Sequence, residues 1–274
     1  MTRDKLIPMP ADAYHADTEW LSAGRLKEFA RSPRRYLAAI NGELDSEPTP
    51  AMLLGSMIHA AILEPDTFSQ HYVPKEKVDG RTKAGKAYNA QWELDNVGKL
   101  AIKRDEEELL AKLQSSLQAH ELSQHLLTGD GLNEHVLQWV DEATGVKCKA
   151  RPDRVLLDNG SDLSSACIDL KTTADASPKA FSKTLSNLGY WRSAVHYLSG
   201  LKHCGLPCDA YYFLCVETGP PYEVAVYEMD ADALERAETR YRIELQEISE
   251  CQQINEWPSL TTINALSLSL PPWF

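Results

Sequence analysis

The sequence lacks any apolar run long enough to span a bilayer. Its longest such run, residues 51–63, contains His59, whereas a membrane-spanning helix needs about 20 apolar residues. The first residues, Met1 to Lys5, are polar and lead into Pro8 and Pro10, so the apolar core of a signal peptide is absent. We therefore expect a cytoplasmic protein with no membrane partner.

Cysteine is present, but not in the arrangement that a structural zinc site requires. The six cysteines include one close pair, Cys204 and Cys208, and no second close pair follows. Structural zinc sites usually take their four ligands from two such pairs. Cys148, Cys167 and Cys215 lie in apolar segments typical of strands, which favours reduced, buried thiols.

The chain also lacks the positive charge of a protein that coats nucleic acid, because its formal net charge is −12. The charge is unevenly distributed. Residues 22–38 carry five basic side chains and one acid, and residues 75–104 carry eight basic and four acidic side chains. Residues 230–250 carry seven acids and three bases. Local basic surfaces on an acidic exterior fit a protein that encloses a polyanion.

Hydrophobic periodicity predicts helices towards both ends of the chain and strands between them. The expected helices cover residues 21–40 with a break at Ser32-Pro33, 51–63, 104–127, 177–186, 189–203 and 231–252. The expected strands cover residues 134–141, 146–157, 165–172, 209–217 and 222–229. The polar, Gly- and Lys-containing residues 74–90 predict a mobile loop or arm. This order indicates an α/β fold in a single domain, residues 1–274, with a mainly helical part over 1–130 and a mixed sheet flanked by helices over 131–274.

Two carboxylates and a lysine are the main candidates for chemistry. Asp153 precedes the apolar residues 155–157, and Asp169, Leu170 and Lys171 lie in the next expected strand. The residues between them, 158–162, have the composition of a turn, so a hairpin would bring Asp153 close to Asp169. The period of two places Asp169 and Lys171 on one face of their strand, with Leu170 on the other. Such a group suits a Mg²⁺ ion beside a cation, which is the equipment for phosphodiester hydrolysis.

These residues and their surroundings resemble RecE-type exonucleases (exodeoxyribonuclease VIII), which belong to the PD-(D/E)XK nuclease superfamily. The similarity covers residues 14–274 and rests on five segments: 21–33, 55–65, 148–154, 169–177 and the terminal residues 270–273. The resemblance implies a PD-(D/E)XK core, a central mixed sheet flanked by helices with a helical N-terminal region. It also implies a Mg²⁺-dependent exonuclease that digests linear duplex DNA from the 5′ end, in which Mn²⁺ can replace Mg²⁺.

The resemblance assigns roles to individual residues. Asp153 and Asp169 would hold the metal, with the Leu170 carbonyl completing its shell, and Lys171 would hold or activate the attacking water. His59 would bind metal or the scissile phosphate, although a histidine on an apolar helix is more often a core residue. Glu134 would be a metal ligand or its neighbour, and an exposed glutamate at a strand edge is the alternative. Candidate DNA contacts are Arg31, Arg34, Arg151, Arg154, Thr172, Thr173, Arg192 and Tyr197; for Arg31 and Arg34 a solvated helix face is the alternative.

The implied partners are double-stranded DNA ends, a single-strand annealing protein that takes the 3′ tails, and further copies of the chain in a ring of three or four. A ring would let the two basic segments line one channel while the acidic residues 230–250 face outward.

One position departs from the family pattern. The usual glutamine four residues before Tyr197 is replaced by Ser193, and Arg192 is the neighbouring candidate to replace it. Three alternatives therefore stay open: an endonuclease, a single-strand nuclease, or a DNA-end-binding protein with weak turnover. The sequence disfavours an iron–sulfur relative, because the C-terminal cysteine cluster of that group is missing.

Overall fold

The structure is a computed structural model, and it describes residues 5–7, 9–44, 47–157, 165–206, 208, 210–261, 267 and 269. The turn expected at residues 158–162 and the terminal residues 270–273 lie outside this part. Within it, no helix is both long and apolar enough to cross a membrane.

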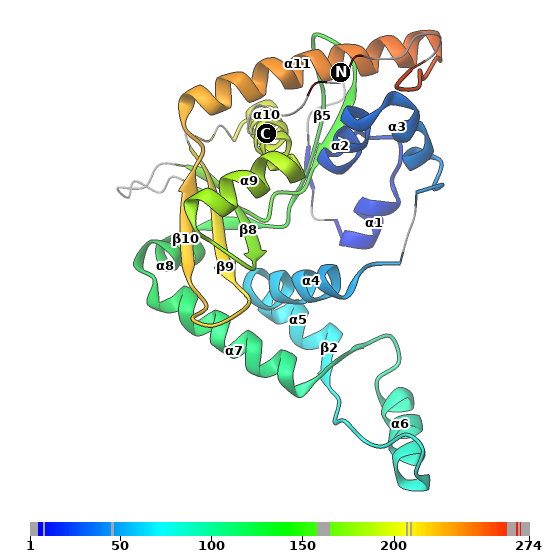
Figure 1. Cartoon of the computed structure of the whole chain (residues 1–274), viewed down its shortest axis with the longest axis vertical. Coiled ribbons are helices and arrows are strands. Elements are labelled where there is room, and N and C mark those ends of the chain that lie inside the picture. The colour runs from blue at the N-terminus through cyan, green and yellow to red at the C-terminus, as the bar shows by residue number, and fades with distance from the viewer. Residues whose placement is uncertain are drawn as a thin grey trace.

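A five-stranded mixed sheet forms the centre of the molecule (Figure 1). Its strands, in spatial order, are β10 (Val224–Glu228), β9 (Ala210–Glu217), β8 (Ala166–Thr173), β7 (Arg154–Leu156) and β4 (Gly131–Asn133). β8 and β9 run parallel, and the other neighbours pair antiparallel. The expected α/β fold with a central mixed sheet is confirmed.

Alternate residues of β8 face two apolar cores, one on each face of the sheet. Cys167 packs in the core that includes α2 (Ala23–Arg31), α9 (Pro178–Leu188), α10 (Tyr190–His203) and α11 (Ala231–Ile254). Ile168 and Leu170 pack in the core that includes α4 (Pro50–Leu63), α7 (Arg104–Ala119) and α8 (Glu121–Thr128). The strand period therefore places Asp169 and Lys171 on the Cys167 side, as the sequence predicts.

A three-stranded sheet adjoins the first and contains β1 (Lys5–Ile7), β5 (Val136–Val140) and β6 (Lys147–Ala150). The expected continuous strand 146–157 is wrong, because β6 and β7 belong to different sheets. Pro152 lies in the gap between them, where it has no N–H to donate to a sheet ladder. The segment from β4 to β5 is interrupted in the same way, because these two strands also belong to different sheets. In this gap the Glu134 N–H donates to the Asp153 carbonyl at 3.1 Å.

Most predicted helices are confirmed, but one predicted helix and one predicted loop need correction. Ser22 and Ser32 cap α2 and α3 (Pro33–Ile40), each accepting a backbone N–H, so the expected break at Ser32-Pro33 is present. The single helix expected over 104–127 is two helices, α7 and α8, which meet at His120. Part of the expected loop 74–90 is helical, since Thr82 caps α6 (Lys83–Asp95). The other short helices are α1 (Ala11–Ala16) and α5 (Pro65–His71).

Candidate metal centre

Asp153 stands at the gap between β6 and β7, where the chain passes from one sheet to the other. β7 pairs with β8 in the register Arg154 to Ile168, and the Leu170 N–H donates to Asp153 Oδ2 at 2.7 Å. This bond fixes the Asp153 carboxylate against the backbone of β8. The predicted hairpin pairing therefore sets Asp153 beside the segment that carries Asp169.

Asp169 is the most deeply buried carboxylate of the site, with 2% of its surface exposed. Its Oδ1 accepts a hydrogen bond from the Lys171 ammonium, and its Oδ2 is buried with no hydrogen-bond partner among the residues that the structure describes. Burial raises the pKa of Asp169 to about 6, against the lowering effect of Lys171. Burial lowers the pKa of Lys171, but Asp169 and Asp153 outweigh it, so the net pKa lies above its ordinary value. Lys171 is therefore an ammonium, and it lies 5.0 Å from the centre of the Tyr190 ring.

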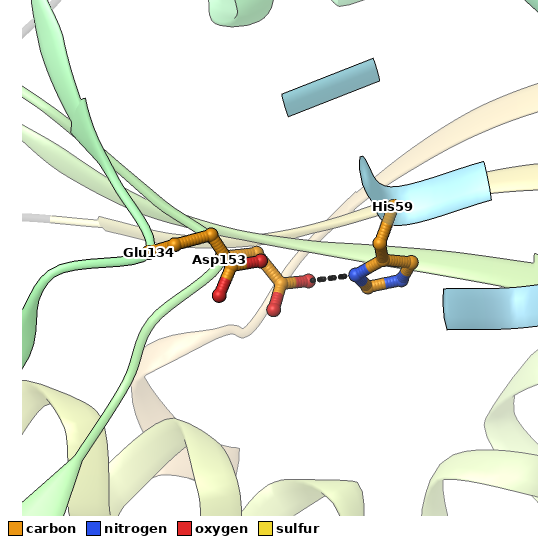
Figure 2. Close-up of side chains that lie close together, drawn as sticks. All are labelled: His59, Glu134 and Asp153. Atoms are coloured by element: carbon orange, nitrogen blue, oxygen red, sulfur yellow. Dashed lines mark ion pairs between the residues drawn. The ribbon is translucent and has the colours of Figure 1, made fainter. Parts of the chain in front are cut away.

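Glu134 lies in the gap between β4 and β5 and approaches Asp153 from there. Its backbone is left-handed, with φ 54°, which is uncommon for a residue other than glycine. This conformation turns the chain between β4 and β5 and leaves only 10% of the Glu134 side chain exposed. Burial, followed by the charge of Asp153, raises the pKa of Glu134 to about 8. Figure 2 shows the Glu134 and Asp153 carboxyl groups close together, facing His59.

His59 reaches the same point from α4. Its Nδ1 lies 3.5 Å from Asp153 Oδ2 (Figure 2). Burial, helped by the nearby Lys171 charge, lowers the pKa of His59 to about 4, so the imidazole is neutral at pH 7. The helix keeps its core contacts through Met57, Ile58 and Ala61, which leaves His59 at the edge of that core.

Arg151 holds Glu134 in this position. Its guanidinium lies 3.0 Å from Glu134 Oε2 and 3.7 Å from Glu64 Oε2, and its Nε donates to the Glu134 carbonyl at 3.2 Å. Glu64, the residue that follows α4, thus anchors the far side of the guanidinium. Sequence reasoning did not identify Glu64 as part of the site, or Tyr14, a buried residue whose phenol is coupled electrostatically to Arg151 and Glu134.

These residues fit a divalent cation. One ligand atom each from His59, Glu134 and Asp153 can lie within 4.8 Å of one another. A neutral imidazole and carboxylate oxygens are suitable donors, and the buried Asp169 Oδ2 has unused acceptor capacity beside them. The structure thus gathers His59 and Glu134 around Asp153, whereas the sequence placed the ion chiefly between Asp153 and Asp169.

Three of the expected DNA contacts have other partners in the fold. Arg154 is 5% exposed and donates to the Leu126 and Gly129 carbonyls and to Asn133 Oδ1, so the expectation of a phosphate contact there is wrong. It ties β7 to the end of α8.

Arg192 forms a two-pronged ion pair with the fully buried Glu244 of α11, at distances from 2.8 Å, and this commits its guanidinium to the α10–α11 contact. The Thr173 hydroxyl donates to the Asp175 carbonyl in the turn after β8. Arg192 is thus engaged with α11, and the Thr173 hydroxyl takes part in the turn after β8.

The remaining candidates are differently placed. Tyr197 is partly buried, and burial raises its pKa well above its ordinary value, with added effects of Tyr14, Asp169 and Asp153 that indicate a position near the site. Thr172 faces α4, because a Cβ at Gly55 would lie 3.8 Å from its Oγ1. Arg34 is exposed, and Arg31 is exposed beside Glu28 at 3.3 Å.

Comparisons with known proteins agree with the fold. A family described as "PDDEXK-like domain of unknown function (DUF3799)" matches residues 22–264. A crystal structure from Eubacterium rectale, described as a "Putative exonuclease", is similar with a TM-score of 0.63 and 14% identity, covering 97% of each chain. The structure described as "SSO0001" has a TM-score of 0.34 and 14% identity over 83% of this chain and 77% of its own, which is too low to support an argument. No curated protein matches the sequence.

Proposed function

Because the chain belongs to the PDDEXK-like family DUF3799, we propose that it is a divalent-metal-dependent nuclease that hydrolyses phosphodiester bonds in DNA. The observation that carries this proposal is the convergence of His59, Glu134 and Asp153 beside Asp169 and Lys171. A buried group of carboxylates with one lysine is unfavourable for stability and is typical of a catalytic site.

In this proposal Asp153, Glu134 and His59 hold the cation, and Asp169 and the Leu170 carbonyl complete its surroundings. The cation, when bound, polarises the phosphate and lowers the pKa of water. Lys171 acts as an ammonium rather than a base, because the neighbouring carboxylates raise its pKa. It orients the attacking water by donating a hydrogen bond and offsets the negative charge that develops on the phosphate. Arg151 keeps the Glu134 carboxylate turned towards Asp153.

The more specific proposal is a Mg²⁺-dependent, RecE-type exonuclease acting as one domain, residues 1–274. It digests linear duplex DNA from 5′ to 3′, and its 3′ tails serve a strand-annealing protein in recombination of the phage type. The motif resemblance supports this choice, as does the description of the similar Eubacterium rectale protein as an exonuclease. A ring of three or four copies would retain DNA between cuts, which light scattering at micromolar concentration tests against the monomer mass of 30.6 kDa.

Digestion of linear and closed circular duplex DNA in Mg²⁺ tests the proposal. Loss of the linear form alone supports the exonuclease, whereas nicking of the circle identifies an endonuclease. Linear single-stranded DNA is the third substrate, and loss of that form alone identifies a single-strand nuclease.

Binding of DNA ends without digestion would contradict the proposed activity. It would favour the weakened DNA-end-binding alternative, which has one structural argument. Ser193 stands where the resembled family usually has glutamine, and the neighbouring Arg192 is paired with Glu244 and is not available to take the place of that glutamine.

A further inference from the structure

Residues 72–103 form an extension that we name the arm. It consists of β2 (Tyr72–Pro74), α6 and β3 (Leu100–Ile102), with β2 and β3 paired in parallel. In Figure 1 the arm projects from the body, and α6 lies at the opposite end of the molecule from α11. Within the arm only Gly85 and Ile102 are buried. A segment so exposed contributes little to the core, so its residues need another explanation.

Contacts within the arm join α6 to the segment that precedes it. The Trp92 indole donates to the Pro74 carbonyl at 3.0 Å, and the Lys75 ammonium lies 4.4 Å from the centre of the Trp92 ring. A Cβ at Gly85 would lie 2.1 Å from the Asp79 carbonyl oxygen, so only glycine allows this loop to pack on α6. These contacts hold α6 against the preceding loop and give the outer surface a defined shape.

Four lysines of the arm have no ion pair with any described residue: Lys77, Lys83, Lys86 and Lys99, all exposed. Other cations of this region do have carboxylate partners, as Arg81 does with Asp79 at 3.1 Å. Lys83 and Lys86 stand near the start of α6, where the helix dipole disfavours positive charge. They therefore do not stabilise their own helix.

The net charge of the arm is opposite in sign to the net charge of the rest of the chain taken together. Residues 72–103 have seven basic and four acidic side chains, a net charge of +3 in a chain of −12, which leaves −15 for the rest. A polyanion is repelled by most of this molecule and attracted here.

The base of the arm lies close to the metal centre along the chain. Glu64, which contacts Arg151 in the centre, directly precedes α5, and β2 begins where α5 ends. α5 has seven residues, so it spans only about 10 Å. Duplex DNA carries one phosphate charge per roughly 1.7 Å of its axis, so a duplex held at the centre presents several phosphates within that distance.

We propose that the arm binds the phosphate backbone of the duplex that the metal centre cleaves, with Lys77, Lys83 and Lys86 as its principal contacts. This proposal rests on the nuclease function proposed above. Contacts of this kind fix the position of the duplex and read no sequence. They add a binding surface outside the metal centre and outside the basic residues 22–38.

Binding without cleavage tests the arm directly. The probe is a fluorescent linear duplex of about 30 base pairs in EDTA, titrated at several salt concentrations. Replacing Lys77, Lys83 and Lys86 together by alanine should weaken binding at least about tenfold near 0.1 M salt. The slope of log Kd against log salt should fall by roughly 2–3, because each phosphate contact contributes about 0.9. The same lysines replaced by arginine should restore the slope.

A control removes two positive charges from α10 and α11. Lys202 and Arg236, which are exposed, are replaced together by alanine, and the slope should stay that of the unaltered protein. Equal melting temperatures of the arm variant and the control variant exclude a folding defect, which exposed side chains give no reason to expect.

The outcomes separate the arm from the nuclease function. An unchanged slope in the arm variant overturns the arm proposal, even if the protein digests DNA normally. A reduced slope in a protein that never cleaves DNA in Mg²⁺ supports the arm and overturns the proposed activity. Leu94 and Val97 are also exposed on the arm, at 71% and 80%. If light scattering shows that the arm variant loses mass while the slope is unchanged, the arm binds a second copy and the proposal is wrong.

Discussion

The central sheet and the arm use charged residues in opposite ways. At the sheet, Asp153, Asp169 and Glu134 are largely buried, and each is held by backbone or by a cation. In the arm, Lys77 and Lys83 are exposed and have no carboxylate partner among the described residues. Buried carboxylates give a cation a fixed position, whereas exposed lysines follow a phosphate backbone without fixed geometry. Changes at the sheet should therefore affect catalysis and metal affinity, and changes in the arm should affect DNA affinity and its salt dependence.

Replacing Lys171 by alanine should have the largest effect. Turnover should fall by roughly 10²–10³-fold, because Lys171, the cation paired with Asp169, stabilises charge in the transition state. DNA affinity should change little, since phosphate contacts lie elsewhere. Gel digestion and anisotropy measure the two quantities, and the exposed Lys112 on α7, replaced by alanine, is the control. Wild-type turnover in the Lys171 variant would remove this residue from the mechanism.

His59 replaced by alanine should reduce turnover by roughly 10–100-fold, because a group near the metal is lost. The fold should persist, since the core contacts of α4 come from Met57, Ile58 and Ala61. Specific activity and the melting temperature are measured on the same sample. A collapse of the melting temperature with normal activity in the folded fraction would identify His59 as a core residue instead.

Arg151 and Arg154 offer a matched pair, because they flank Asp153 in the sequence and have different roles. Replacing Arg151 by methionine should weaken Mn²⁺ binding by about tenfold, because Glu134 loses the group that orients it. Replacing Arg154 by methionine should lower the free energy of unfolding by about 2–4 kcal/mol, because buried carbonyls lose their donor. Calorimetry and thermal unfolding measure the two effects. If Arg154 proved more important than Arg151 for Mn²⁺ affinity, the assignment would be reversed.

Metal binding should release protons in a defined pH range. Glu134, with a pKa of about 8, is mostly protonated at pH 7, and Asp169, with a pKa of about 6, is mostly ionised. We expect roughly one proton released per Mn²⁺ at pH 7 and almost none at pH 9, as calorimetry in buffers of different ionisation enthalpy would show.

The same pKa shift should make the metal-free protein less stable as pH rises from 4.5 to 8. Over that range the folded protein holds a proton on Glu134 that the unfolded chain has released. In the proton-release experiment, the variant with Glu134 replaced by glutamine is the control, and it should lose most of the proton release. Proton release that increases towards pH 9 would contradict the assigned pKa of Glu134.

The sequence predicted the parts of this site that depend on local patterns. The period of two in β8 correctly placed Asp169 and Lys171 on one face, and the hairpin placed Asp153 beside them. Pro152 could have indicated the gap between β6 and β7, because proline interrupts a sheet ladder. The left-handed backbone of Glu134 had no such signal, since nothing in its residue type requires it.

Features that depend on distant segments could not be predicted. Arg154 binds carbonyls at positions 126 and 129, and Arg192 binds Glu244, so their loss as DNA contacts follows from tertiary packing alone. The helix in the arm is different. Thr82 as a cap, followed by the alanine-containing residues 83–95, predicts a helix by local rules. The loop prediction relied on the glycine and lysine content of this segment and overlooked that signal.

The central claim is that two gaps between strands build a divalent-metal site. One gap lies between β4 and β5 and carries Glu134, and the other lies between β6 and β7 and carries Asp153. A crystal soaked with Mn²⁺ tests it through the anomalous scattering of the ion. We predict a peak bonded to the carboxylates of Asp153 and Glu134 at ~2.1 Å, with His59 or Asp169 beside it. Ordered Mn²⁺ elsewhere in the protein, with these two carboxylates bare, would contradict the account.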